Sequence, residues 1–256
     1  MVNLIRMDLY QMRKSKAFIV CLILAFALAL SSSPLEKLLF VLARSLSNEI
    51  NETFIAEVNF SSILTNPFPM MGMMIALISL CYFFYADVEN GYVKNIAGQM
   101  PLKGFTVLSK FMAAIVHNLL FAAAGIIGNV IGCLIVRKIT PDSNLLDSIR
   151  ILVLKLLLLQ SISATLLLVV ATLRSKSMGM ILAVLFGLGH TGLLYAGINE
   201  ALKPVFGQGT DIARYMPDAV MGRYPLDTLT ALAVSIIWGG LFLLLAIRVF
   251  DRKDVN

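Results

Sequence analysis

Three ionisable side chains lie deep within the long apolar stretches of this sequence: His117, Lys155 and His190. A histidine in such a setting can relay protons, contact a substrate or form a hydrogen bond to a neighbouring helix. His117 and Asn118, with Asn129 further along, predict a polar stripe on one membrane helix. This stripe could line a translocation pathway or hold helices together. For His190, a substrate contact and a contact with a neighbouring helix both remain open.

Sequence signatures of several other chemistries are missing from the chain. No Asp or Glu lies inside the predicted spans, whereas proton- or cation-coupled carriers place carboxylates there. The Gly-x-x-x-x-Gly-Lys-Ser/Thr phosphate loop is missing, as are the His-Glu-x-x-His, Gly-x-Gly-Asp and Gly-x-Ser-x-Gly motifs of metallo-, aspartyl and serine hydrolases. Cys21, Cys81 and Cys133 have no zinc-like spacing. We therefore expect no catalytic residues, no metal site and no enzymatic activity in this chain.

The elements that position these side chains are predicted to be membrane-spanning helices. Apolar residues make up 59% of the 256 residues, charged residues only 14%, and the mean hydropathy is +0.86. Soluble domains carry about a quarter charged residues, so a soluble enzyme, a disordered chain and a disulfide scaffold are excluded. We expect an all-α polytopic membrane protein, one transmembrane domain with six transmembrane helices. The predicted spans are Ala17–Ser33, Phe68–Ala86, Phe111–Val136, Ile151–Leu173, Met178–Ile198 and Leu229–Val249.

The basic residues predict the orientation of the spans. With both termini in the cytoplasm, the inner segments hold 12 basic and five acidic residues, and the outer segments hold nine basic and ten acidic residues. This asymmetry agrees with the positive-inside rule. The first span follows Arg13, Lys14 and Lys16 and also resembles a cleaved signal peptide, but a retained span gives an even count. The net charge of +6 comes from residues flanking apolar stretches, so no nucleic-acid partner is expected.

Several connections have a helical pattern of their own. Val2, Ile5, Leu9 and Met12 form a stripe that predicts an N-terminal interfacial helix, or else a cytoplasmic extension of the first span. Prolines should mark the connections, so Pro34 is expected to end the first span. The leucines between Pro34 and Pro67 then predict a helix that lies along the outer membrane surface or caps the spans. The segment Asn199–Thr228 is expected to form short helices dipping into the outer leaflet.

Gly125, Gly128 and Gly132 form a face of small residues on the third predicted span. Such faces let two helices approach closely. The sequence leaves open whether the second helix belongs to the same subunit or to another one.

The inner loop Asp87–Lys110 has the most specific pattern in the chain. Asp87–Ala97 can form a short amphipathic helix with Tyr92, Val93 and Ile96 as its apolar residues. Acidic residues near its start and Lys94 further along suit the helix dipole.

This loop resembles that of type-two ABC exporter permeases. The resemblance rests on the run Glu89-Asn-Gly91-Tyr-Val-Lys94-Asn95-Ile, followed by Pro101-Leu-Lys103 and by Lys110 at the start of the next span. It implies a cytoplasmic coupling helix that docks on a separate ATPase subunit. The implied docking residues are Glu89, Gly91, Tyr92, Lys94, Asn95 and Ile96.

The resemblance also implies partners and a location. Two ABC ATPase subunits would bind ATP and magnesium, this chain would bind no cofactor itself, and a second permease, the same or paralogous, would complete the pathway. Within the family, this chain most resembles Gram-positive permeases that export peptides and toxins, which implies amphipathic or hydrophobic peptide substrates and a bacterial cell membrane. A membrane sensor or immunity protein that binds a ligand without transport, and a secondary carrier, are the alternatives. The sequence leaves the substrate, the choice between homodimer and heterodimer, and the direction of transport open.

Overall fold

The computed structural model describes residues 2–46, 57–69, 71–89, 104–141, 144–189, 191–206, 211–223 and 226–252. The described residues are mostly helical, which supports the all-α prediction. The helices are α1 (Val2–Lys14), α2 (Lys16–Leu46), α3 (Phe60–Thr65), α4 (Gly72–Glu89), α6 (Gly104–Val136), α7 (Leu145–Leu173), α8 (Lys176–Gly187), α9 (Thr191–Phe206), the 3-10 helix η1 (Ile212–Tyr215), α10 (Pro217–Met221) and α11 (Thr228–Arg252). Two short strands, β1 (Glu57–Asn59) and β2 (Lys138–Thr140), pair in parallel.

Within the described residues, four helices are long and apolar enough to cross a membrane. They are α2 over Lys16–Ser45, α6, α7 and α11. The apolar helices α4 and α8 are shorter. A membrane-embedded protein is therefore supported, and four of the described helices are candidate spans, which does not confirm the six spans expected from the sequence.

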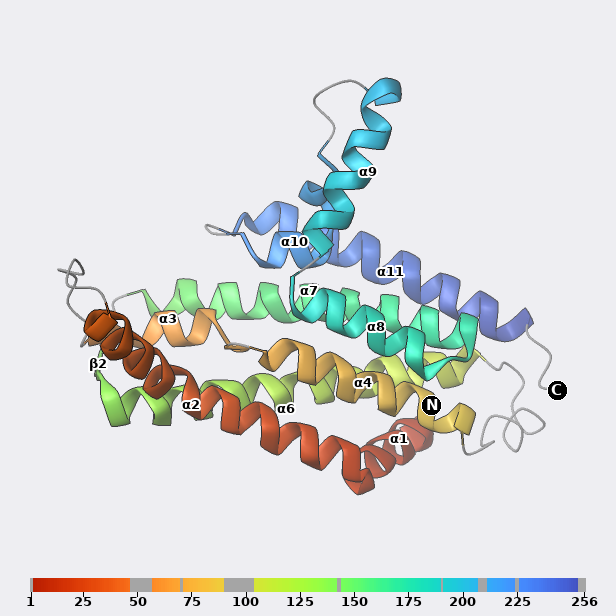
Figure 1. Ribbon diagram of the computed structural model, residues 1–256. Coiled ribbons are helices and arrows are strands. Elements are labelled where there is room, and N and C mark those ends of the chain that lie inside the picture. Colours follow the sequence, from red (N-terminus) through yellow and green to blue (C-terminus); the bar gives the residue numbers. More distant parts are fainter. Residues whose placement is uncertain are drawn as a thin grey trace.

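The long helices run roughly along one common axis, and α9 projects away from them (Figure 1). Helix α2 packs on α6, α11 packs on α7, and α4 lies against both α2 and α8. Their shared core contains completely buried apolar side chains such as Leu77, Leu158 and Ile162. The helix α1 and the last turn of α11 lie at one end of the bundle, and α3 with the strand pair lies at the other (Figure 1). The first described helix and the end of the last one are thus at the same end of the bundle.

The expected break at Pro34 is wrong. Helix α2 continues through Pro34 to Leu46, so the leucines after Pro34 belong to the same helix as the first span. A proline has no N–H to donate to the carbonyl of the residue four positions earlier, here Leu30. That carbonyl lies against α6, where a Cβ added at Gly132 would be 2.2 Å from its oxygen. A close neighbouring helix thus faces the carbonyl that Pro34 leaves without an intrahelical partner.

The expected span Met178–Ile198 is not one continuous helix. Helix α8 ends at Gly187, and a turn follows in which Gly189 has φ +69°. This left-handed conformation favours glycine and commonly ends helices. Gly187 itself lies against α4, because a Cβ there would be 2.3 Å from the Cα of Met74. After the turn, α9 leaves in a different direction (Figure 1).

The glycine face of α6 packs within this chain. A Cβ at Gly125 would lie 2.0 Å from the carbonyl oxygen of Pro67, and one at Gly128 would lie 2.7 Å from that of Phe26. The backbone of α6 therefore lies directly against α2 and the segment before α4. The sequence left open whether the glycine face packs on a helix of the same subunit or of another one, and in the structure the partner belongs to the same chain.

Candidate functional site

A cluster of buried charges joins three helices at the α1 end of the bundle. Lys110 on α6 places its Nζ 3.0 Å from Asp87 Oδ2 on α4 and 3.7 Å from Asp8 Oδ1 on α1. The same ammonium donates a hydrogen bond of 3.2 Å to the Phe83 carbonyl, and Ser109 donates one to Asp8. These side chains are almost completely buried. We refer to Asp8, Asp87, Ser109 and Lys110 as the charge cluster.

The charge cluster holds two carboxylates around one ammonium. Burial raises the pKa of Asp8 above its usual value, and this effect exceeds the opposing attraction of Lys110 and the hydrogen bond from Ser109. Asp8 Oδ1 and both Asp87 oxygens accept no hydrogen bond from the part of the chain that the structure describes, where Lys110 holds Asp87 through an ion pair. Loss of one partner from a buried ion pair leaves an uncompensated charge and is strongly destabilising. The cluster therefore acts as a rigid link between α1, the end of α4 and the start of α6.

The charge cluster lies on both flanks of the inner loop. Asp87 was expected to begin an amphipathic helix, but α4 continues through it to Glu89, which is exposed. The other predicted docking residues, Gly91, Tyr92, Lys94, Asn95 and Ile96, lie outside the described residues. The structure thus defines how the loop is anchored at its two ends.

Sequence reasoning did not identify Asp8 as part of a site. The buried face of α1 consists of Leu4, Asp8 and Met12, at a spacing of four, whereas Val2 of the predicted apolar stripe is exposed. The available signal was that a lone aspartate shares a face with two apolar residues.

His117 and Asn118 join a second buried network in the middle of the bundle. His117 Nε2 lies 3.1 Å from Ser79 Oγ on α4, and its ring stacks on Phe121. Asn118 Nδ2 donates hydrogen bonds to Gln160 Oε1 and Ser163 Oγ on α7, at 2.9 and 3.0 Å. His117 and Asn118 therefore tie α6 to α4 and to α7.

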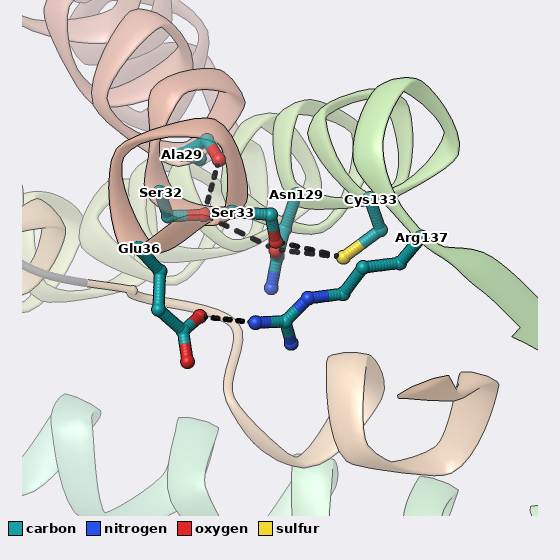
Figure 2. Close-up of polar contacts among 7 residues, drawn as sticks. All are labelled: Ala29, Ser32, Ser33, Glu36, Asn129, Cys133 and Arg137. Atoms are coloured by element: carbon teal, nitrogen blue, oxygen red, sulfur yellow. Dashed lines mark hydrogen bonds and ion pairs between the residues drawn. The ribbon is translucent and has the colours of Figure 1, made fainter. Parts of the chain in front are cut away.

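Asn129 does not join this network. It faces α2 near the opposite end of the bundle, where Ser32 donates to its Oδ1 at 3.3 Å (Figure 2). The predicted polar stripe of α6 is thus divided between two separate contacts. His190 lies outside the described residues.

Replacing Asn118 with leucine should lower the free energy of unfolding by about 1 kcal/mol, because it removes hydrogen bonds between membrane helices. Thermal unfolding in detergent would measure the change. Ser31→Ala is a suitable control, since Ser31 donates only to Leu28 of its own helix and should have little effect. Normal stability together with altered substrate transport would instead indicate a pathway-lining residue.

No protein-family model matches this chain, and no curated protein matches it.

Proposed function

We propose that this chain is the membrane subunit of an ATP-driven exporter of the type-two ABC class. Its substrates are amphipathic or hydrophobic peptides, moved out of a bacterial cell. The observation that best supports the proposal is the charge cluster. It fastens the last turn of α4 and the first turns of α6, the two flanks of the loop with the coupling-helix pattern, to each other and to α1.

The anchoring gives the loop a mechanical role. A displacement of the loop by an ATPase would act on α4 and α6 together, because Lys110 contacts Asp87, the Phe83 carbonyl and Asp8 at once. Helix α6 packs against α2 through backbone contacts at its glycines, so a movement of α6 carries α2 with it. Closure of an ATPase pair on binding ATP could in this way shift the spans between two states.

The assembly we propose contains two copies of a permease chain and two ATPase subunits, which bind ATP and magnesium. The second permease is a copy of this chain or a paralogue. Both termini lie in the cytoplasm, on the side of the charge cluster. The predicted spans contain no carboxylate and offer much Leu, Phe and Met surface, which favours an apolar or amphipathic substrate over a hydrophilic one.

The experiment that tests the proposal is copurification of an ATPase with the chain and with loop variants. Tyr92→Ala should weaken ATPase association about thirtyfold, the equivalent of about 2 kcal/mol for a buried aromatic anchor, and should abolish export. Gly91→Leu should do the same by blocking close approach of the partner, and Lys94→Ala should have a smaller effect.

Tyr215→Ala provides a matched control, because Tyr215 is an exposed tyrosine that belongs to η1 and not to the loop. It should leave ATPase association unchanged. Normal association and export by both Tyr92→Ala and Gly91→Leu would refute the coupling role. A chain that never copurifies with an ATPase would favour the sensor function.

A further inference from the structure

A cleft of about 480 Å³ opens between α2 and α6 at the end of the bundle opposite the charge cluster. Its volume falls in the range of about 300–1,000 Å³ that is common for small-ligand sites. One wall is apolar and includes Leu35, Leu39 and Ile63. The polar part of the lining comes from the middle of α2, from the last turns of α6 and from Arg137 just after α6. We refer to this site as the α2–α6 cleft.

The polar floor of the cleft presents a hydrogen-bond donor. Asn129 is nine-tenths buried, and its Oδ1 accepts from Ser32 at 3.3 Å and from the Cys133 thiol at 3.6 Å. Figure 2 shows its side-chain nitrogen directed away from these partners, toward the side on which Glu36 and Arg137 meet. This nitrogen has no hydrogen-bond partner among the described residues. The amide N–H groups of Asn129 are thus directed toward an acceptor that would lie in the cleft.

The cleft also contains a cation held by an exposed carboxylate. Arg137 Nη2 lies 2.7 Å from Glu36 Oε2, and the Arg137 side chain is 10% exposed whereas that of Glu36 is 64% exposed (Figure 2). An ion pair with one partner in solvent is weak, because water and salt screen it. A carboxylate from a ligand can therefore exchange with Glu36 at the guanidinium, which binds carboxylates well.

The helices that form the cleft are held firmly beneath it. A Cβ at Gly132 would lie 2.2 Å from the Leu30 carbonyl oxygen, so α2 and α6 are in backbone contact just before the cleft begins. Ser33 Oγ lies 3.0 Å from Cys133 Sγ and joins the helices again at its floor. The positions of Asn129 and Arg137 relative to α2 are therefore largely set before a ligand arrives.

We infer that the α2–α6 cleft binds the C-terminal carboxylate of an amphipathic peptide. Asn129 and Arg137 contact the carboxylate, Glu36 swings out to solvent, and the last apolar residues of the peptide lie against Leu35, Leu39 and Ile63. The preference for a carboxylate rests on the cleft geometry alone, and the choice of a peptide rests on the proposed function.

The test is equilibrium binding of a fluorescent apolar hexapeptide to the full chain in phosphatidylcholine nanodiscs. The peptide is used with a free C-terminal carboxylate and with a C-terminal amide. The free acid should bind at least tenfold more tightly than the amide. Glu36→Gln should tighten binding of the free acid about fivefold, because it removes the internal competitor, and should leave the amide unchanged. Arg137→Gln should weaken binding of the free acid at least tenfold.

Arg150→Gln is the matched control, because Arg150 pairs with Asp147 in an exposed ion pair outside the cleft, and it should not change binding. Equal affinity for acid and amide, or no response to Glu36→Gln, would overturn the inference. Displacement of the free acid by phosphatidylglycerol in the nanodiscs would assign the site to a lipid headgroup and also overturn it. Because no ATPase is present, these outcomes are independent of the copurification test.

Discussion

A leucine at Gly132 is expected to prevent the chain from reaching its folded state. The first atom of any side chain there would lie 2.2 Å from the Leu30 carbonyl oxygen, whereas ordinary contacts of this kind are 3.4–4 Å. The obstacle is backbone, so relief requires α2 and α6 to separate by more than 1 Å along their contact. Overpacking a core costs about 1–3 kcal/mol or more, against a total stability of about 5–15 kcal/mol. A leucine adds three further atoms to this clash.

The measurement is the yield of monodisperse protein by size-exclusion chromatography in detergent, followed by the thermal unfolding midpoint. Gly240→Leu is the matched control, because Gly240 also lies in a candidate span but has no atom within 4 Å of an added Cβ. It should give a normal yield. If Gly132→Leu folded as well as Gly240→Leu, the direct packing of α6 on α2 would be wrong.

Replacing Lys110 with methionine should produce the second large effect, a loss of about 3–5 kcal/mol in the free energy of unfolding. The substitution leaves Asp8 and Asp87 buried without their cation, which is the costly way to break a buried ion pair. Adding Asp8→Asn and Asp87→Asn removes the unpaired charges and should restore most of the stability. Chemical unfolding of the single and triple variants would measure both changes.

The triple variant also separates stability from coupling. If the charge cluster transmits the movement of the loop, the triple variant should fold and bind the ATPase but export poorly. Normal export by a stable triple variant would show that the cluster serves stability alone.

Because of Asp8, the contribution of the charge cluster to the free energy of unfolding should depend on pH and should fall as the pH rises. Its raised pKa means that the folded chain binds a proton there more tightly than the unfolded chain does. Its stabilising contribution is fully present below about pH 4, the ordinary pKa of an aspartate, and is lost as the pH rises through the raised value. Asp8→Asn should remove this contribution to the pH profile of unfolding.

The membrane class of the fold could be predicted from the sequence because it follows from local hydropathy. The stretches 111–136, 151–173 and 229–249 each lie within one helix, α6, α7 or α11. Two differences between the predicted and the observed helices depend on contacts between helices. Pro34 remains within a helix whose Leu30 carbonyl faces α6, and Met178–Ile198 divides where Gly187 meets α4. Neither neighbour is visible in a local sequence window.

Only part of the candidate site could be predicted from the sequence. Asp87 and Lys110 were recognised as the ends of the inner loop, but their pairing with each other and with Asp8 needs the fold. A lone aspartate on an amphipathic helix is ordinarily solvated, so the sequence offered no reason to bury Asp8. His117 and Asn118 were placed correctly on one helix, and only the structure shows that they face α4 and α7.

The uninterrupted helix α2 makes the protein sensitive to the thickness of the bilayer. Its 31 residues correspond to a length of about 46 Å, against a hydrocarbon thickness of about 30 Å. The helix is thus longer than the hydrocarbon layer, and its second half, which carries Glu36, Lys37 and Arg44, extends beyond that layer. The segment beyond Pro34 still exposes Leu38, Leu39 and Leu42, so acyl chains or apolar ligands can contact the helix there. Each ångström of mismatch costs a fraction of a kcal/mol, so lipid chain length becomes a variable that acts directly on the helix bordering the α2–α6 cleft.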